Sequence, residues 1–152
     1  THSFPTRRSS DLLKLACFVS IHQENDQLRG CIGTAKPKNK NLFQEIIDNA
    51  IAAATQDPRF DPLKEEELNN IKVSVDVLSQ PKDVEDINLL KPHKHGIIVS
   101  DQEGREALLL PNLDGIESTE KQIAMAKKKA GINPKLPDNE LSIKYFTTTR
   151  YK

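Results

Sequence analysis

The stretch that decides the fold is ACFVSIHQENDQLRGCIGT, residues 16–34. β-branched and aromatic side chains alternate with polar ones on both sides of the polar pair Asn25-Asp26, a pattern typical of a β-hairpin. A two-residue turn at this pair makes Glu24 the partner of Gln27. The sequence therefore predicts that two strands joined by this turn begin an antiparallel sheet.

This register sorts the side chains of the hairpin onto two faces. On one face, the opposed pairs are Phe18 with Gly33, Ser20 with Cys31, and His22 with Arg29. The other face is apolar and consists of Cys17, Val19, Ile21, Leu28 and Ile32. Cys17 and Cys31 thus point to opposite faces, which excludes a relaxed disulfide between them. A three-residue loop in place of the two-residue turn would change the partner of every side chain.

Two further segments have helical patterns. Residues 41–56, NLFQEIIDNAIAAATQ, predict a helix with Asn41 as its cap. Its expected buried face is Leu42, Phe43, Ile46, Ile47, Ala50, Ile51 and Ala54. Residues 118–131 predict a second helix, with Thr119 and Gln122 at capping-box spacing. Three consecutive lysines of that helix are expected to be a solvated face: Lys127, Lys128 and Lys129.

The remaining regular segments have strand patterns. Residues 57–62, DPRFDP, end the first helix with two prolines, and residues 71–79 then alternate like a strand with one buried and one wet face. Residues 96–111 predict a second hairpin with Gly104 in its turn, and residues 141–149 predict a last strand. Because hairpins supply most of the sheet, we expect an α+β fold, with a largely antiparallel sheet flanked by helices.

Composition excludes several classes of function. The 152 residues suit one domain, and Lys plus Arg equals Asp plus Glu at 22 each, so no basic surface for nucleic acid or an anionic membrane is expected. No run approaches the ~20 apolar residues of a membrane span. Two cysteines are too few for a secreted disulfide framework, which indicates the cytoplasm. No nucleotide-binding or hydrolase motif is present, and we expect no cofactor.

The N-terminal residues have a separate origin in our interpretation. Residues 2–12, HSFPTRRSSDL, resemble one translated reading frame of a sequencing adapter. We therefore treat residues 1–12 as an artefact leader and residues 13–152 as the domain.

Cys31 is the candidate nucleophile, with His22 as a possible base. A free thiol is only a few per cent thiolate at pH 7, and a neighbouring Arg or His⁺ raises that fraction. The expected substrate-binding residues are Ser20, Arg29, Gly30, Gly33, Thr34 and Arg59. The alternative for Cys31 is packing, because a small residue in a crowded sheet is often an inert cysteine.

Two other groups have simpler alternatives. Arg59 suits a carboxylate or phosphate ligand, but an ion pair with Asp57 or Asp61 would also explain it. His93 and His95 lie in the lysine-rich KPHKH, where no cysteine or carboxylate completes a ligand set, so no metal site is expected.

Six motifs in order resemble the AMMECR domain family. They are LRGCIGT, NAIAAATQDPRF, VSVDVLSQP, GIIVS, LLLP and KKKAGI. The longer DGIESTEKQIAMAKKKAGI is most similar to the bacterial branch, AmmeMemoRadiSam system protein A. The resemblance covers about residues 16–151. Family members usually have further helical sequence before the first hairpin, so residues 13–152 resemble a domain that lacks this N-terminal part.

The resemblance implies two lobes around a cleft, with the Arg-Gly-Cys and DPRF segments near that cleft. It also implies an association with a Memo-like protein and a radical S-adenosylmethionine enzyme, while the activity of the family is unsettled. Two hypotheses follow. The protein is an enzyme or enzyme component that acts on a small anionic substrate in the cleft, or a non-catalytic adaptor whose cleft binds a partner protein.

Overall fold

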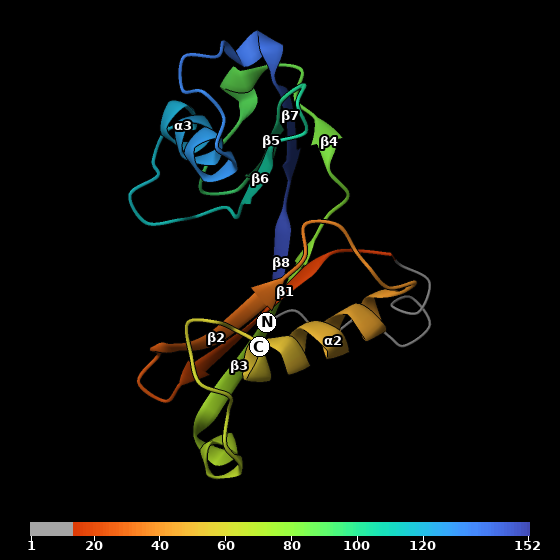
Figure 1. The fold of residues 1–152 in the computed structure, drawn as a ribbon, viewed down its shortest axis with the longest axis vertical. Coiled ribbons are helices and arrows are strands. Elements are labelled where there is room, and N and C mark those ends of the chain that lie inside the picture. Colours follow the sequence, from red (N-terminus) through yellow and green to blue (C-terminus); the bar gives the residue numbers. More distant parts are fainter. Residues whose placement is uncertain (1–13) are drawn as a thin grey trace. The chain divides into compact units, whose positions relative to one another are not determined.

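The computed structural model describes residues 14–152, so the predictions for residues 1–12 lie outside it. The described residues form two compact units, the first built from residues 14–78 together with 149–152, and the second from 79–148. Within residues 14–152, each unit contains one four-stranded sheet and one α-helix (Figure 1). The α+β prediction is confirmed, with two separate sheets where one was expected. No helix in the described part of the chain is long and apolar enough to cross a membrane.

The sheet of the first unit has the strand order β2-β1-β3-β8, and β1 runs antiparallel to both of its neighbours. Its elements are β1 (Cys17–Gln23), β2 (Leu28–Gly33), α2 (Leu42–Thr55), the 3-10 turn η1 (Glu65–Asn70), β3 (Ile71–Leu78) and β8 (Thr148–Tyr151). The predicted first hairpin, first helix and central strand are therefore all present.

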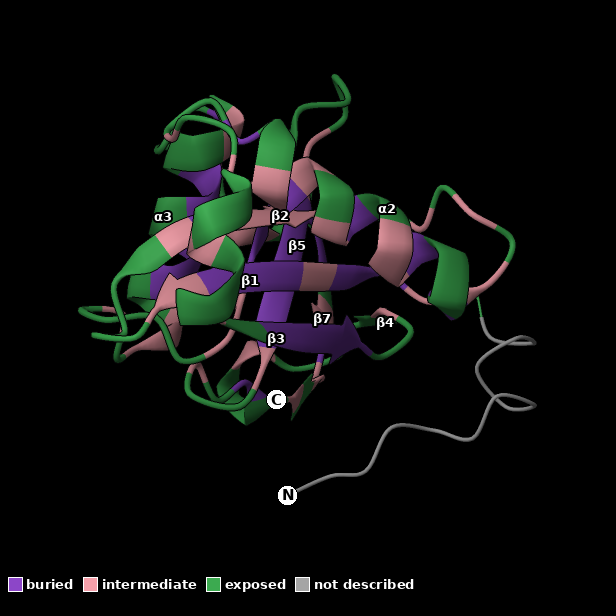
Figure 2. Ribbon diagram, turned by 90° about the horizontal axis from the view of Figure 1, so that it is seen from below, coloured by how far each residue is buried: buried purple, intermediate pink, exposed green. Residues whose placement is uncertain are grey.

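Helix α2 covers one face of this sheet. Alternate residues of the strands form a core with the helix, and its buried members are Cys17, Val19, Leu42, Val75 and Val77. Tyr151 of β8 packs against the same core. Since successive strand residues point to opposite faces, the residues between these core positions lie on the face away from α2. The end of β3 is buried, as its colour in Figure 2 shows. This holds for both faces, because Ser74 and Asp76 are buried as well as Val75 and Val77. The prediction that one face of this strand is exposed to solvent is therefore wrong at these residues.

The buried side of α2 differs from the predicted one. Its fully buried residues are Leu42, Glu45, Asn49 and Ala53. Phe43 and Ile51, both expected in the core, are 56% and 55% exposed. Leu42 is buried as predicted, and Ile46 and Ala50 pack against the core. Hydrophobic periodicity missed Glu45 and Asn49 because it scores Glu and Asn as solvent-facing, although both have hydrogen-bond partners here.

Glu45 anchors the loop between β2 and α2. Its carboxylate accepts hydrogen bonds from Thr34 Oγ1 at 2.6 Å and from the backbone N–H groups of Lys38 and Asn39. Burial alone would raise the pKa of Glu45, but these hydrogen bonds together outweigh burial and lower it. The carboxylate therefore stays ionised. It supplies the hydrogen-bond acceptors that the backbone N–H groups of the loop require.

The hairpin loop has three residues, 24–26, where two were expected. Gln23 N–H donates to Gln27 O at 2.8 Å, and Asp26 N–H donates to Gln23 O at 3.0 Å. Asp26 has a φ of 64°, the left-handed conformation that closes such a loop. Aspartate tolerates this conformation better than most non-glycine residues.

A β-bulge then restores the predicted register over most of the hairpin. Next to the loop His22 pairs with Leu28, so the predicted pairing of His22 with Arg29 is wrong. The register shifts by one residue after His22, which leaves Arg29 as the extra residue of β2. Beyond the bulge, Ser20 pairs with Cys31 as predicted. The extra residue in the loop and the extra residue at the bulge compensate each other, so the predicted register holds beyond the bulge.

The sheet of the second unit has the strand order β4-β7-β5-β6. Its elements are β4 (Lys82–Asp83), η2 (Ile87–Leu89), β5 (Gly96–Ser100), β6 (Glu106–Leu109), α3 (Thr119–Ala130), η3 (Asp138–Glu140) and β7 (Ser142–Phe146). The predicted second hairpin is confirmed, with Gly104 at a φ of 82°. Ser118, one residue before the predicted Thr119, caps α3 by accepting from Lys121 N–H.

Two predictions for this half of the chain are wrong. Residues 141–149 form two strands in different sheets, broken at Thr147, whose N–H and C=O both bond to Ser79. The lysine run is also not simply solvated. Lys127 is buried, and its ammonium donates to Leu136 O at 2.8 Å and pairs with Asp138 at 3.0 Å.

The small residues of β2 allow two close approaches. A Cβ on Gly30 would overlap the backbone carbonyl of Ala53 in α2, and one on Gly33 would overlap the Phe18 ring. Gly30 thus points toward the helix, and Gly33 points toward the opposite face with Phe18. A backbone carbonyl inside a helix cannot move aside, whereas an aromatic ring can rotate.

We expect Gly30→Ala to destabilise the first unit by about 2 to 3 kcal/mol, and Gly33→Ala by about 1 kcal/mol. Urea unfolding followed by circular dichroism measures both. Phe18→Leu combined with Gly33→Ala should recover part of the loss, whereas it should not help Gly30→Ala. Equal losses at the two glycines would contradict this assignment of faces.

We expect Glu45→Gln to destabilise the protein by about 1 to 3 kcal/mol at pH 7, because an amide NH₂ would face the donors of the loop. The folded pKa of Glu45 is lowered, so its stabilisation is complete above the unfolded value of about 4.3 and is lost as pH falls through the folded value. The difference in urea midpoint between wild type and variant should therefore shrink on acidification. The exposed Glu66→Gln should show no such difference at either pH.

Candidate functional site

The face of the first sheet away from α2 gathers the predicted polar residues. We call it the polar face, and its members are Phe18, Ser20, His22, Cys31, Lys72, Ser74, Asp76 and Arg150. Its centre is a row across three strands, in which Ser20 pairs with Cys31 on one side and with Ser74 on the other. Arg150 belongs to this face because the adjacent Tyr151 packs in the core on the α2 side.

The two cysteines occupy different environments, as predicted. Cys17 is 0% exposed, and burial raises the pKa of its thiol to about 11. Cys31 is partly exposed, and its Sγ accepts a hydrogen bond from Ser20 Oγ at 3.3 Å. The group in contact with the Cys31 thiol is thus Ser20, and not the predicted base His22.

The DPRF segment binds the outer edge of β2 at Cys31. Asp57 accepts the Cys31 N–H at 3.0 Å, and Arg59 Nη2 donates to Cys31 O at 3.4 Å. Asp57 and Arg59 also form a forked pair, with distances of 3.0 Å from Nε and 2.8 Å from Nη2. Two side chains therefore supply the hydrogen bonds that a further strand would make at this edge.

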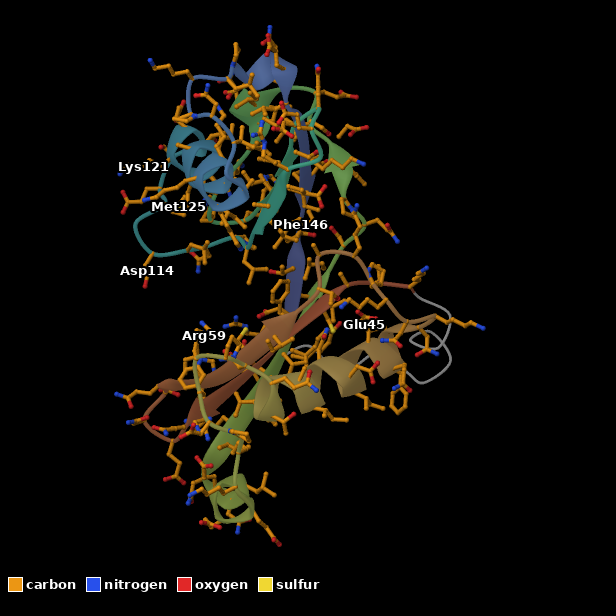
Figure 3. All side chains as sticks on the ribbon, viewed as in Figure 1. Glu45, Arg59, Asp114, Lys121, Met125 and Phe146 are labelled. Atoms are coloured by element: carbon orange, nitrogen blue, oxygen red, sulfur yellow. The ribbon has the colours of Figure 1, made fainter. Side chains whose placement is uncertain are left out.

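The two side chains of the Asp57–Arg59 pair differ strongly in their exposure to solvent. The Asp57 side chain is 2% exposed and that of Arg59 is 56% exposed. The hydrogen bond from Arg59, followed by that from Cys31 N–H, holds the pKa of Asp57 far below its usual range. Arg59, labelled in Figure 3, lies at the edge of the first sheet with its guanidinium partly in solvent. The expected alternative, an ion pair with Asp57, is therefore present, and the exposed part of Arg59 remains available to a ligand.

Arg29 has a different partner. Its guanidinium makes a forked pair with Glu67 of η1, at 2.9 Å and 3.2 Å, and lies 5.9 Å from the centre of the Phe60 ring. Arg59 lies 5.5 Å from the same ring. The hydrogen bond with Glu67 is the main cause of a raised Arg29 pKa. Arg29 thus ties η1 to the bulge of β2, and its guanidinium is engaged by Glu67.

Arg150 and Asp76 form a third forked pair, which was not predicted from the sequence. Both bonds measure 2.8 Å, and the Arg150 side chain is 54% exposed against 7% for Asp76. The only signal in the sequence was an aspartate in the alternating IKVSVDVL, which looked like a wet position. Its arginine is 74 residues away along the chain, so no local pattern could connect them.

Two half-exposed guanidiniums, those of Arg59 and Arg150, lie within electrostatic reach of Cys31. The pKa of Arg59 is raised chiefly by its hydrogen bond to Asp57, and that of Arg150 chiefly by its bond to Asp76. In each case a charge on Cys31 adds a smaller increase. Arg59 and Arg150 are therefore the cations within electrostatic reach of Cys31, in place of the expected Arg29.

The other predicted site residues have structural contacts. Gly30 faces α2, Gly33 lies under Phe18, and Thr34 donates to Glu45. In the second unit, His95 Nδ1 accepts from Lys91 N–H and its ring stands edge-on to Tyr145 at 5.2 Å. Among residues 14–152, no group of three or more His, Cys, Asp or Glu side chains is placed to hold a metal ion.

These features define an α+β domain of two units, in which a cysteine on an edge strand is clamped by an Asp-Pro-Arg-Phe turn. The chain belongs to the AMMECR1 family, whose model matches residues 3–151. This confirms the resemblance found in the motifs.

Relatives of the chain come from bacteria and archaea. A Thermotoga maritima protein is 50% identical over 139 residues, which cover 91% of this chain and 78% of the relative. A Clostridium acetobutylicum protein is 43% identical over 92% of this chain, but the match covers only 29% of that longer relative. The crystal structure of an uncharacterized Pyrococcus horikoshii protein matches with a TM-score of 0.79 and 30% identity, covering 96% of this chain and 77% of that one.

We expect iodoacetamide to modify Cys31 well before Cys17 in the folded protein, because Cys17 is buried and its pKa is raised to about 11. Mass spectrometry of quenched samples follows both sites. Cys31→Ser should remove the fast phase, whereas Cys17→Ala should keep it. Equal rates at the two thiols under native conditions would contradict their assignment to opposite faces.

Proposed function

We propose that this AMMECR1-family chain binds a small anionic molecule on the polar face, beside Cys31. The observation that carries the proposal is a pair of half-exposed arginines, Arg59 and Arg150, each held by a buried carboxylate and each within electrostatic reach of Cys31. An arginine fixed in this way loses little further side-chain entropy when it binds a ligand.

Both guanidiniums keep donors for a ligand. The hydrogen bonds to the two aspartates, and that to Cys31 O, use Nε and Nη2 of each group. A guanidinium has five N–H donors, so the two on each Nη1 remain for a carboxylate or phosphate oxygen. Each aspartate offsets much of the charge of its arginine, which favours a ligand recognised by directed hydrogen bonds as well as by charge.

Cys31 is the group proposed to contact the reacting part of the ligand. Its thiol accepts from Ser20 Oγ, is partly exposed, and lies within electrostatic reach of Arg59 and Arg150. These features support a nucleophilic role in an enzyme or enzyme subunit, with Ser20 adjacent to the thiol. His22 lies two residues from Ser20 on β1 and therefore on the same face of the sheet.

The proposed partners are a Memo-like protein and a radical S-adenosylmethionine enzyme, and the proposed location is the cytoplasm. The similarity of the segment DGIESTEKQIAMAKKKAGI to the bacterial branch supports the partners, and two free thiols support a reducing compartment. The match covers only 29% of one longer relative. An activity of such a longer protein is therefore only proposed for this chain.

The second candidate function is an adaptor that binds a partner protein. Phe43 and Ile51 on the outer side of α2 favour it, because they expose large apolar side chains on one helix. An adaptor has no need of small anions beside Cys31, so the following assay separates the two functions.

We expect small anions to protect Cys31 from iodoacetamide in a saturable manner. Acetate, malonate, inorganic phosphate and phenyl phosphate are the probes, compared at equal ionic strength. Arg59→Lys and Arg150→Lys should each weaken protection by about tenfold, because lysine keeps the charge and loses the fork.

Arg105→Lys is the matched control, since Arg105 also pairs with a buried aspartate, Asp101, in the second unit. It should leave protection unchanged. If no anion protects Cys31, or if the Arg105 variant weakens protection as much as the other two, the small-anion function fails and the adaptor stands.

A further inference from the structure

A cavity of about 610 Å³ opens on the first unit next to the centre of the polar face. Its lining residues are His22, Asp26, Lys72, Val73, Ser74, Arg150 and Lys152. They come from the hairpin loop and from three neighbouring strands or strand ends. Ser74 is buried, and it pairs with Ser20, which contacts the Cys31 thiol.

The register explains why positive side chains meet there. Lys72 pairs with His22 across β1 and β3, two residues from Ser74, so Lys72 and Ser74 share one face. Arg150 and Lys152 flank Tyr151, whose ring packs on the α2 side, so these two cations share the opposite, polar face. The alternation of two adjacent strands thus points three cations at one cavity.

The lining is net positive, with three cations and one carboxylate. The carboxylate, Asp26, pairs with Lys72 at 3.3 Å, but both side chains are largely exposed, so this pair is weak and exchangeable. Arg150 is held by Asp76 behind it and keeps the donors of Nη1. Lys152 extends the charge past the end of β8.

A cavity in the second unit shows the opposite chemistry. Its volume is about 520 Å³, and its charged lining is Lys82, Asp83, Glu85 and Asp86. Three carboxylates and one ammonium would repel an anion. Of these two cavities, only the one beside Ser74 has a lining whose side chains are net positive, although the whole chain has no net charge.

We infer that the cavity beside Ser74 binds a phosphate monoester group, which is the anionic end of the ligand in the proposed function. A phosphate monoester carries nearly two negative charges at pH 7 and three acceptor oxygens. Arg150, Lys72, Lys152 and the Ser74 hydroxyl offer more donors, from more directions, than the two oxygens of a carboxylate can use.

The same geometry sets the size of the ligand. Ser74, Ser20 and Cys31 lie on three successive strands, so Ser74 and Cys31 are separated by two strand spacings, about 10 Å. A small phosphorylated molecule of about this length, with its phosphate in the cavity, extends across Ser20 to the thiol. This step rests on the proposed function, whereas phosphate binding in the cavity does not.

The test is a titration with phenyl phosphate, followed by amide chemical shifts in ¹⁵N-labelled full chain, with benzoate as the monoanionic comparison. We expect saturable shifts centred on Lys72, Ser74 and Arg150. Lys72→Ala and Lys152→Ala should each raise the dissociation constant by about three- to tenfold, and raising NaCl from about 50 mM to about 500 mM should weaken binding further. Benzoate should bind at least about tenfold more weakly.

Both lysines are largely exposed, so the variants should fold, and Lys144→Ala on β7 is the matched control from the second unit. Shifts that never saturate would overturn the inference, as would equal weakening by Lys144→Ala, or benzoate binding as tightly as phenyl phosphate. A single-stranded oligonucleotide that binds more tightly per site than phenyl phosphate would also overturn it in favour of a polymer site.

Cys31 alkylation in the same samples separates the two proposals. If phenyl phosphate binds at the cavity and leaves Cys31 unprotected, the phosphate site stands and the function beside Cys31 fails. If anions protect Cys31 equally in wild type and in the two lysine variants, the function stands and the phosphate site fails.

Discussion

The candidate site depends on one hydrogen bond, from the Cys31 N–H to the buried carboxylate of Asp57. Cys31 lies on an edge strand, where a backbone N–H has no partner strand. Asp57 supplies that partner, and the same carboxylate holds the guanidinium of Arg59. The position of the thiol and the direction of the arginine are therefore set by a single side chain.

Buried carboxylates also fix the position of other groups at two further places in the first unit. Glu45 holds the loop before α2 by accepting from two backbone N–H groups and a threonine hydroxyl, and Asp76 holds Arg150 on the polar face. A buried carboxylate is tolerated only when its oxygens are bonded, and here each one is. The unit therefore orders its loops and arginines through ionised groups at positions that usually carry apolar side chains.

The polar face illustrates how a chain without net charge can favour one kind of ligand. Arg59 and Arg150 are each offset by an aspartate, so their contribution is mainly directional. Lys72 and Lys152 also line the cavity, and the pair of Lys72 with Asp26 is weak because both side chains are largely exposed, so the contribution of the two lysines is mainly charge. Direction near the thiol and charge near Ser74 suit a molecule with a phosphate at one end and a smaller polar group at the other.

Local pattern was enough to determine most of the helices and strands and the pairing of Ser20 with Cys31. Strand alternation, turn residues and helix caps act over a few residues, so the two hairpins, both helices and the α+β class follow from the sequence alone. The motifs in order also determined the family. Beyond the bulge, the predicted register of the first hairpin is correct because the longer loop and the bulge at Arg29 compensate each other. The conformational preferences of single residues do not predict this compensation.

Only the tertiary structure decided which charged groups are buried and what they hold. Glu45, Asp57 and Asp76 all look solvent-facing by pattern, and their partners are supplied by other segments of the chain. The replacement of Arg29 by Arg59 and Arg150 as the cations near Cys31 has the same origin. The free energy of a buried ion depends on atoms brought together by folding, and hydrophobic periodicity contains no information about them.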